Sequence, residues 1–117
     1  MSIESVVAAL LRTQCPRVFP DVAPISTARP YVTYQQIGGT AIQTLGREVP
    51  NKRNGFVQVN VWANTRAEAA ALAGSIDAAF RLAATMQASP MAEPTSTNDD
   101  DLGLRGTVQE FSVWADR

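Results

Sequence analysis

Three consecutive carboxylates, Asp99, Asp100 and Asp101, are the densest set of chemically capable side chains in this 117-residue sequence. Paired carboxylates can act as general acid and general base, and clustered carboxylates can bind calcium. The run lacks the alternating spacing and the closing glutamate of a calcium loop. It follows Thr97 and Asn98 in a polar segment, so we expect a solvated loop or an interaction surface and no metal site.

The composition argues against nucleophilic catalysis. The chain has no histidine and one cysteine, Cys15, so neither a Ser-His-Asp triad nor a Cys-His pair can form within it. The same counts exclude an intramolecular disulfide and a zinc site built from histidine and cysteine. We expect Cys15 to be a small buried residue beside Pro16. We predict no catalytic residue, no cofactor and no bound metal.

Three cations, Arg47, Lys52 and Arg53, are clustered in a polar segment that we expect to form a loop. Such a loop is either solvated or contacts a partner protein or DNA, and contact with DNA would be weak and salt-sensitive. Gly38 and Gly39 precede a strand-like stretch and no helix. They therefore predict a two-residue hairpin turn and no phosphate-binding loop.

Two tryptophans, Trp62 and Trp114, each end an expected strand. By strict alternation the Trp62 indole lies on the face opposite Val57, Val59 and Val61. Tryptophan is enriched in the cores of protein interfaces, so both residues are candidate subunit or partner contacts. The alternative is that both pack at sheet edges or under loops of their own chain.

The elements that must position these residues follow from local patterns. An apolar stripe behind Ser2 predicts a first helix, and the capping-box spacing of Thr65 and Glu68 predicts a second. Alternating apolar and polar residues predict the strands. In chain order we expect a helix to Gln14, an extended connection over 16–30, strands over 31–37 and 40–45, a loop over 46–55, a strand over 56–62, a helix to about 85–87, an edge strand over 87–95, an acidic loop over 96–101 and a strand over 104–114.

These elements predict an α+β fold in one domain, residues 1–117, with the order α-β-β-β-α-β-β. We expect one antiparallel sheet of about four to five strands with two helices packed on one face. The core of that face is expected to contain Val57, Val59, Val61, Leu72, Ile76 and Phe80.

The overall charge excludes two broad classes of protein. Lys and Arg number 10 against 11 Asp and Glu, which does not fit a generally basic nucleic-acid binder or an acidic disordered tail. The longest apolar run, residues 6–11, is far shorter than the ~20 residues of a membrane span, and the first residues do not resemble a signal peptide. We expect a protein made in the cytoplasm, without a membrane partner.

Five stretches occur in an order and spacing typical of one family: VFPDVAP at 18–24, RPYVTYQ at 29–35, VQVNVWA at 57–63, AEAAALA at 67–73 and FSVW at 111–114. In this respect the chain resembles the tail completion proteins of long-tailed bacteriophages or prophages. That family is related to tail terminator and tail-to-head joining proteins. The resemblance extends over nearly the whole chain.

The resemblance implies structural work with no catalytic residues. Such proteins form rings, usually hexameric, at the head-proximal end of the virion tail, where they stop tail-tube polymerisation and join tail to head. The implied partners are identical subunits, the tail tube protein and a head-completion protein, with DNA passing through the lumen. The alternative is a small non-enzymatic α+β ligand-binding or regulatory module, monomeric or dimeric.

The two charged loops suggest how neighbouring subunits would be oriented. The loop Arg47–Arg53 and the loop Asp99–Asp101 carry opposite charges in a chain that is almost neutral overall. Complementary charge sets register more than affinity. We expect the two loops to meet between neighbours, while Trp62 and Trp114 supply the burial.

Overall fold

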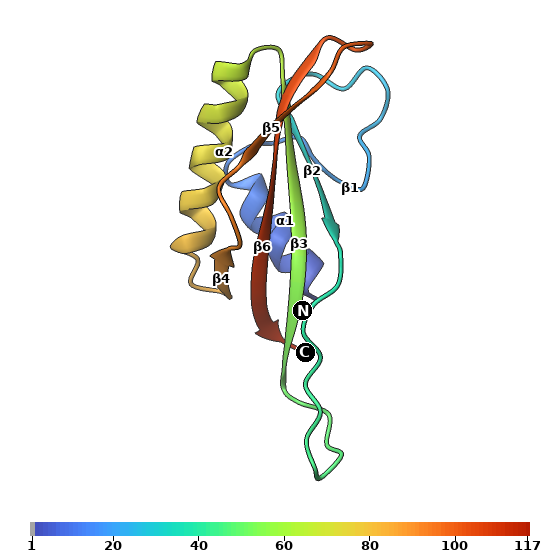
Figure 1. The fold of residues 1–117 in the computed structure, drawn as a ribbon, viewed down its shortest axis with the longest axis vertical. Coiled ribbons are helices and arrows are strands. Elements are labelled where there is room, and N and C mark those ends of the chain that lie inside the picture. The colour runs from blue at the N-terminus through green and yellow to red at the C-terminus, as the bar shows by residue number, and fades with distance from the viewer. Residues whose placement is uncertain (1) are drawn as a thin grey trace.

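Two long central strands organise the fold in the computed structural model, which describes residues 2–117 (Figure 1). They are paired antiparallel from Lys52 opposite Asp116 to Ala63 opposite Arg105. The elements in chain order are α1 (Ile3–Arg12), β1 (Val18–Pro20), β2 (Tyr31–Gln36), β3 (Lys52–Ala63), α2 (Arg66–Arg81), β4 (Gln87–Pro90), β5 (Thr95–Asp99) and β6 (Leu104–Asp116). The sheet order is β1-β2-β3-β6-β4, and β5 also pairs with β6.

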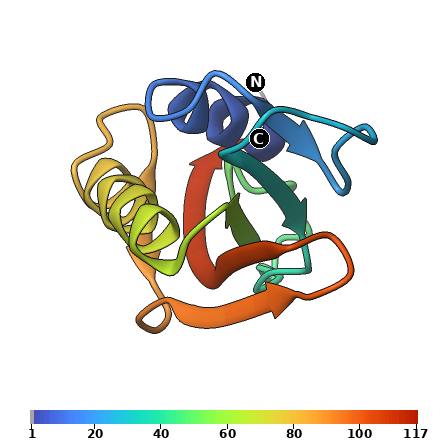
Figure 2. The ribbon, with the colours of Figure 1, turned by 90° about the horizontal axis from the view of Figure 1, so that it is seen from above.

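Both helices cover one face of the curved sheet (Figure 2). The odd-numbered residues of β3 point to that face, and Val57, Val59 and Val61 are each at most 2% exposed. Ile76 and Phe80 of α2 are buried against them, which confirms these five members of the expected core. The sixth, Leu72, is only partly buried and packs at the margin of the core.

The helix starts agree with their capping signals. The Ser2 hydroxyl accepts a hydrogen bond from the Ser5 amide at 3.1 Å, and the Thr65 hydroxyl accepts one from the Glu68 amide at 3.2 Å. Both helices end earlier than expected, at Arg12 and Arg81. After α2 the chain must turn back within a few residues, because β4 pairs with β6 from position 87 onward.

The prediction of a hairpin turn at Gly38 and Gly39 is wrong, and residues 40–45 form no strand. Instead β2 pairs directly with β3, and the Ile37 amide continues this ladder by donating to the Phe56 carbonyl at 2.8 Å. Gly39 then runs so close to β3 that a Cβ there would overlap the Asn54 backbone. Gly39 therefore serves a close strand approach rather than a turn, and the Gly38 carbonyl accepts a hydrogen bond from the Phe56 amide at 2.8 Å.

The expected extended connection over 16–30 contains a strand that the sequence patterns do not predict. β1 is three residues long and pairs parallel with β2, so the sheet is mixed, although mostly antiparallel. Residues 2–117 contain six strands, in the element order α-β-β-β-α-β-β-β, against the four to five expected.

The edge strand expected over 87–95 is split in two. β4 pairs with the C-terminal part of β6, and β5 pairs with the N-terminal part. Pro90 and Pro94 bound the interruption, and proline cannot donate a ladder hydrogen bond. Residues 96–99 of the expected acidic loop are consequently part of β5.

The molecule is elongated, with axis extents of 53 × 26 × 22 Å. Residues 40–51, which we term the arm, project beyond the strands at one end, and the turn between β5 and β6 lies at the other (Figure 1). None of the helices within residues 2–117 has the length and hydrophobicity that a membrane span requires.

Candidate subunit and partner interface

The predicted cations do not share one loop. Arg47 lies on the arm, whereas Lys52 and Arg53 are the first residues of β3, so the expected loop over 46–55 is too long. The strand continues through them because they pair with Asp116 and Ala115 of β6. The cations and the acidic turn lie at opposite ends of the chain, and so do not meet within one molecule (Figure 1).

The cations at the arm end differ in their partners. The Lys52 ammonium forms an ion pair with Asp116, and both side chains are more than 60% exposed. This hydrogen bond and the positive charge of Lys52 lower the pKa of the Asp116 carboxyl. Arg47 is exposed and forms no ion pair with any residue in 2–117. Arg47 is therefore the cation best placed to contact another molecule.

The acidic turn is held in shape by two arginines from outside it. Arg105 approaches Asp100 at 3.5 Å. The Arg29 guanidinium donates to the carbonyls of Leu102 at 2.5 Å and Gly103 at 3.3 Å. Arg29 thereby ties the loop before β2 to the β5–β6 turn, and it leaves Asp101 exposed without an ion pair in the described chain.

No metal-binding constellation is found among residues 2–117: no group of three or more histidine, cysteine, aspartate or glutamate side chains converges on one point. Cys15 is buried at 2% exposure. Its sulfur lies 3.6 Å from the carbonyl oxygens of Arg17 and Pro30. These contacts place Cys15 as a packed side chain between α1 and the connection to β2.

Both tryptophans lie on the sheet face that the helices leave open, and both are half-buried. Trp62 is paired with Tyr31 of β2 on one side and with Gly106 of β6 on the other. A Cβ at Gly106 would lie 2.9 Å from the Trp62 ring, so the absence of a side chain there makes room for the indole.

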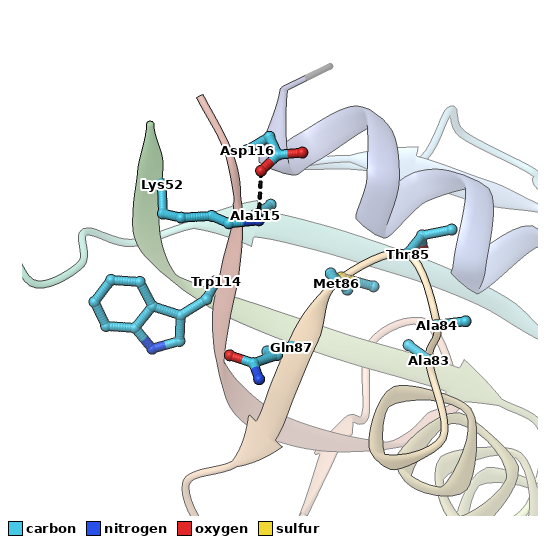
Figure 3. A pocket seen from close by; sticks show the side chains of 9 residues that line it. All are labelled: Lys52, Ala83, Ala84, Thr85, Met86, Gln87, Trp114, Ala115 and Asp116. Atoms are coloured by element: carbon cyan, nitrogen blue, oxygen red, sulfur yellow. Dashed lines mark hydrogen bonds and ion pairs between the residues drawn. The ribbon is translucent and has the colours of Figure 1, made fainter. Parts of the chain in front are cut away.

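Trp114 marks the opposite end of the same face. It is paired with Asn54 of β3 and Gln87 of β4. A cleft of about 450 Å³ lies beside it, and the ion-paired Lys52 and Asp116 are among the residues that line it (Figure 3). The Trp114 indole and the Gln87 side chain lie together along this cleft (Figure 3).

A groove lies beside Trp62 at the acidic end. Its cavity of about 310 Å³ lies next to a second of about 290 Å³, and both are lined by Tyr31, Leu102 and Leu104. Burial raises the pKa of the Tyr31 phenol, Arg29 opposes this rise, and Asp99 adds to it. We term this site the groove; its walls are residues 21–27 and the β5–β6 turn.

The sequence patterns did not indicate the exposed apolar side chains at the two ends of the molecule. Leu45 and Val49 on the arm are 106% and 73% exposed, and Val22 and Leu102 beside the groove are 78% and 59% exposed. The only available signal was the occurrence of large apolar residues in segments rich in glycine, proline and polar residues. Such isolated residues show no periodicity, so they identify no face before the fold is known.

Comparisons with known proteins place the chain in a family. No curated protein matches it. A solved structure of a protein without a functional name superposes with a TM-score of 0.57, covering 97% of this chain and 89% of the other at 16% sequence identity, which shows a shared fold. Residues 3–116 match the family described as Tail completion protein gp17. Because this match spans nearly the whole chain, the protein belongs to the tail completion protein gp17 family, a structural family of the phage tail.

Proposed function

We propose that this protein closes the head-proximal end of the phage tail tube and joins tail to head as a hexameric ring through which DNA passes. Membership of the tail completion family supports a structural role in the virion tail and contacts with other tail or head proteins. The partners in this proposal are the tail tube protein, a head-completion protein and identical subunits.

The observation that carries the ring proposal is the opposite charge of the two ends. The arm end has a surplus of two positive side chains, from Arg47, Lys52, Arg53 and Arg117 against Glu48 and Asp116. The groove end has a surplus of two carboxylates, from Asp21, Asp99, Asp100 and Asp101 against Arg29 and Arg105. Contacts between two different patches of identical subunits propagate head to tail, and they close into a ring when the rotation permits.

The open sheet face supports the proposal independently. Aromatic residues lie toward both of its ends, Tyr31 and Trp62 at one and Phe56 and Trp114 at the other. Exposed ion pairs contribute only about 0–1 kcal/mol each, so burial of such aromatic side chains must supply most of the affinity. In this proposal the charges orient the subunits, and Trp62 and Trp114 anchor them.

Light scattering on the purified chain tests the ring. We expect a species of about 75 kDa, six times the 12.6 kDa chain. In a joining assay with purified heads and with tails that lack this protein, adding the chain should restore infectious particles. A monomer or dimer that stays unchanged at high concentration and in the presence of tail tubes would contradict the ring. That result would favour a small ligand-binding or regulatory module.

A further inference from the structure

We infer that the arm of one chain docks into the groove of a second copy, with its apolar side chains in the two cavities and Arg47 facing the groove carboxylates. This inference rests on the proposed ring and specifies the contact between its subunits. The contact involves apolar residues of the arm and of the groove in addition to the charged residues at the two ends.

The arm is built like a binding segment. All side chains from position 41 to 49 are exposed, including the apolar Ile42, Leu45 and Val49. The arm is anchored at its root, where the Thr40 amide donates to the Asn54 side chain at 2.8 Å and the Arg117 amide donates to the Asn51 carbonyl at 2.7 Å. Apolar side chains held away from the core in this way gain free energy only by burial against another surface.

The groove is already formed in the single chain. Leu104 is 3% exposed, and half-buried Tyr31 and Trp62 lie beside it. Arg29, two residues after the first wall, bonds to Leu102 and Gly103 of the second wall and is held in place by a further bond to the Asn64 side chain. A pre-formed apolar site avoids the entropic cost of ordering its walls when a segment binds.

Geometry and charge indicate a second copy as the occupant. The arm and the groove lie at opposite ends of a molecule 53 Å long, so an arm as described does not reach its own groove (Figure 1). Asp21 and Asp99 line the groove, and Arg47 is the unpaired cation of the arm. Glu48 follows Arg47, so the arm must enter with Glu48 turned away from these carboxylates. Each copy thus carries both halves of one contact.

Cross-linking between two variants tests the contact in the full-length chain. One preparation carries Leu45→Cys on the arm, the other carries Leu102→Cys in the groove, and both keep the buried Cys15. After mixing and treatment with a short bismaleimide, we expect a covalent dimer from the mixture and little from either preparation alone. Leu82→Cys, at an 83% exposed position at the end of α2, replaces Leu45→Cys in the matched control and should give no product with Leu102→Cys.

The outcomes separate this inference from the ring itself. Absence of the cross-link in samples that light scattering shows to be hexameric would overturn arm docking and leave the ring standing. Absence of any oligomer would overturn both. A cross-link from Leu45→Cys to the tail tube protein, with none between copies, would show that the occupant of the groove is not a second copy.

A substitution at the arm tip gives a second readout. Leu45→Ser should leave the melting temperature of the dilute monomer unchanged, because Leu45 is fully exposed in the single chain. It should weaken assembly roughly tenfold or more, the value of one buried leucine. Leu82→Ser is the control for loss of an exposed leucine and should do neither. Equal assembly by both variants would overturn the inference.

Discussion

The two faces of the central sheet differ in what covers them, although their residues alternate along the same strands. On β3 the odd-numbered residues Val57, Val59 and Val61 lie under the helices and are at most 2% exposed. The even-numbered residues between them, together with Trp62, are half-buried and have no helix above them. One face therefore stabilises the single chain, and the other is available to hold a neighbour.

The core face should show the largest effect on stability. The Phe80 ring stacks on Phe111 with centroids 4.0 Å apart, and Phe80 is 1% exposed. Phe80→Ala should lower the free energy of unfolding by about 3–5 kcal/mol, measured by urea denaturation. Leu82→Ala, at an exposed position nearby, should change it by no more than about 0.5 kcal/mol. Similar losses for the two variants would show that Phe80 is not in the core.

The open face should show the next largest effect, on assembly rather than on folding. Trp62→Ala and Trp114→Ala should each weaken self-association by about 2 kcal/mol, or roughly thirtyfold, if the indoles are interface anchors. The unfolding free energy of the monomer should fall by less than in Phe80→Ala, because both indoles are only half-buried. Gln58→Ala, on the same face between them, is the control. Unchanged self-association in both tryptophan variants would place the indoles in contacts within their own chain.

Charge reversal at the two ends should have a smaller effect, because exposed ion pairs are weak. Replacing Arg47, Lys52 and Arg53 by Glu should slow assembly or head–tail joining several-fold. Replacing Asp99, Asp100 and Asp101 by Lys in the same chain should partly restore it.

The three cations should not contribute equally to the effect of this charge reversal. Lys52 already pairs with Asp116 in its own chain and Arg53 is half-buried, so Arg47→Glu alone should account for most of the change. If the aspartate-to-lysine substitutions do not restore assembly, the two ends do not face each other. The cations would then be available to line the DNA passage, and the salt dependence of DNA binding would measure that contact.

The smallest expected effect is a pH dependence at the edge of the core face. Burial raises the pKa of Asp77, but hydrogen bonds from Gln109 and Arg81 outweigh it and hold the pKa below its usual range. The folded pKa is thus lower than the unfolded one, so the stabilisation is present at neutral pH and is lost as the pH falls below about 4.

Unfolding measured between neutral pH and pH 3 tests this assignment. Asp77→Asn removes the titrating group and should flatten part of the acid decline of the unfolding free energy. An unchanged pH profile in Asp77→Asn would assign that decline to other carboxylates.

Local patterns correctly predicted those helices and strands that are defined by residues close together in the sequence, such as helix caps and alternating strands. The caps at Ser2 and Thr65 and the alternation through β3 were correctly predicted, because capping and side-chain alternation depend on a few adjacent residues. The same alternation placed Trp62 opposite Val57, Val59 and Val61 before any tertiary contact was known.

Other features depended on partners far along the chain. Gly38 and Gly39 have the composition of a hairpin turn. Instead Gly38 bonds to the Phe56 amide of β3, the β3 backbone lies against Gly39, and the chain continues into the arm. β1 is only three residues long, and it is a strand because β2 lies parallel beside it. Neither pairing leaves a local signature, since both join residues that are distant in sequence.

The sequence by itself determined the fold class, the composition of the core and the absence of histidine-dependent chemistry. Propensity and periodicity depend on residues that are close in the chain, and a residue count depends on no spatial arrangement. The tertiary structure alone decided that the cations and the carboxylates lie at opposite ends, and that Leu102 and Leu104 form a groove with Tyr31 and Trp62. The positions of these side chains depend on strand register and on the bonds of Arg29 across two loops. Register and such long-range bonds are properties of the assembled sheet.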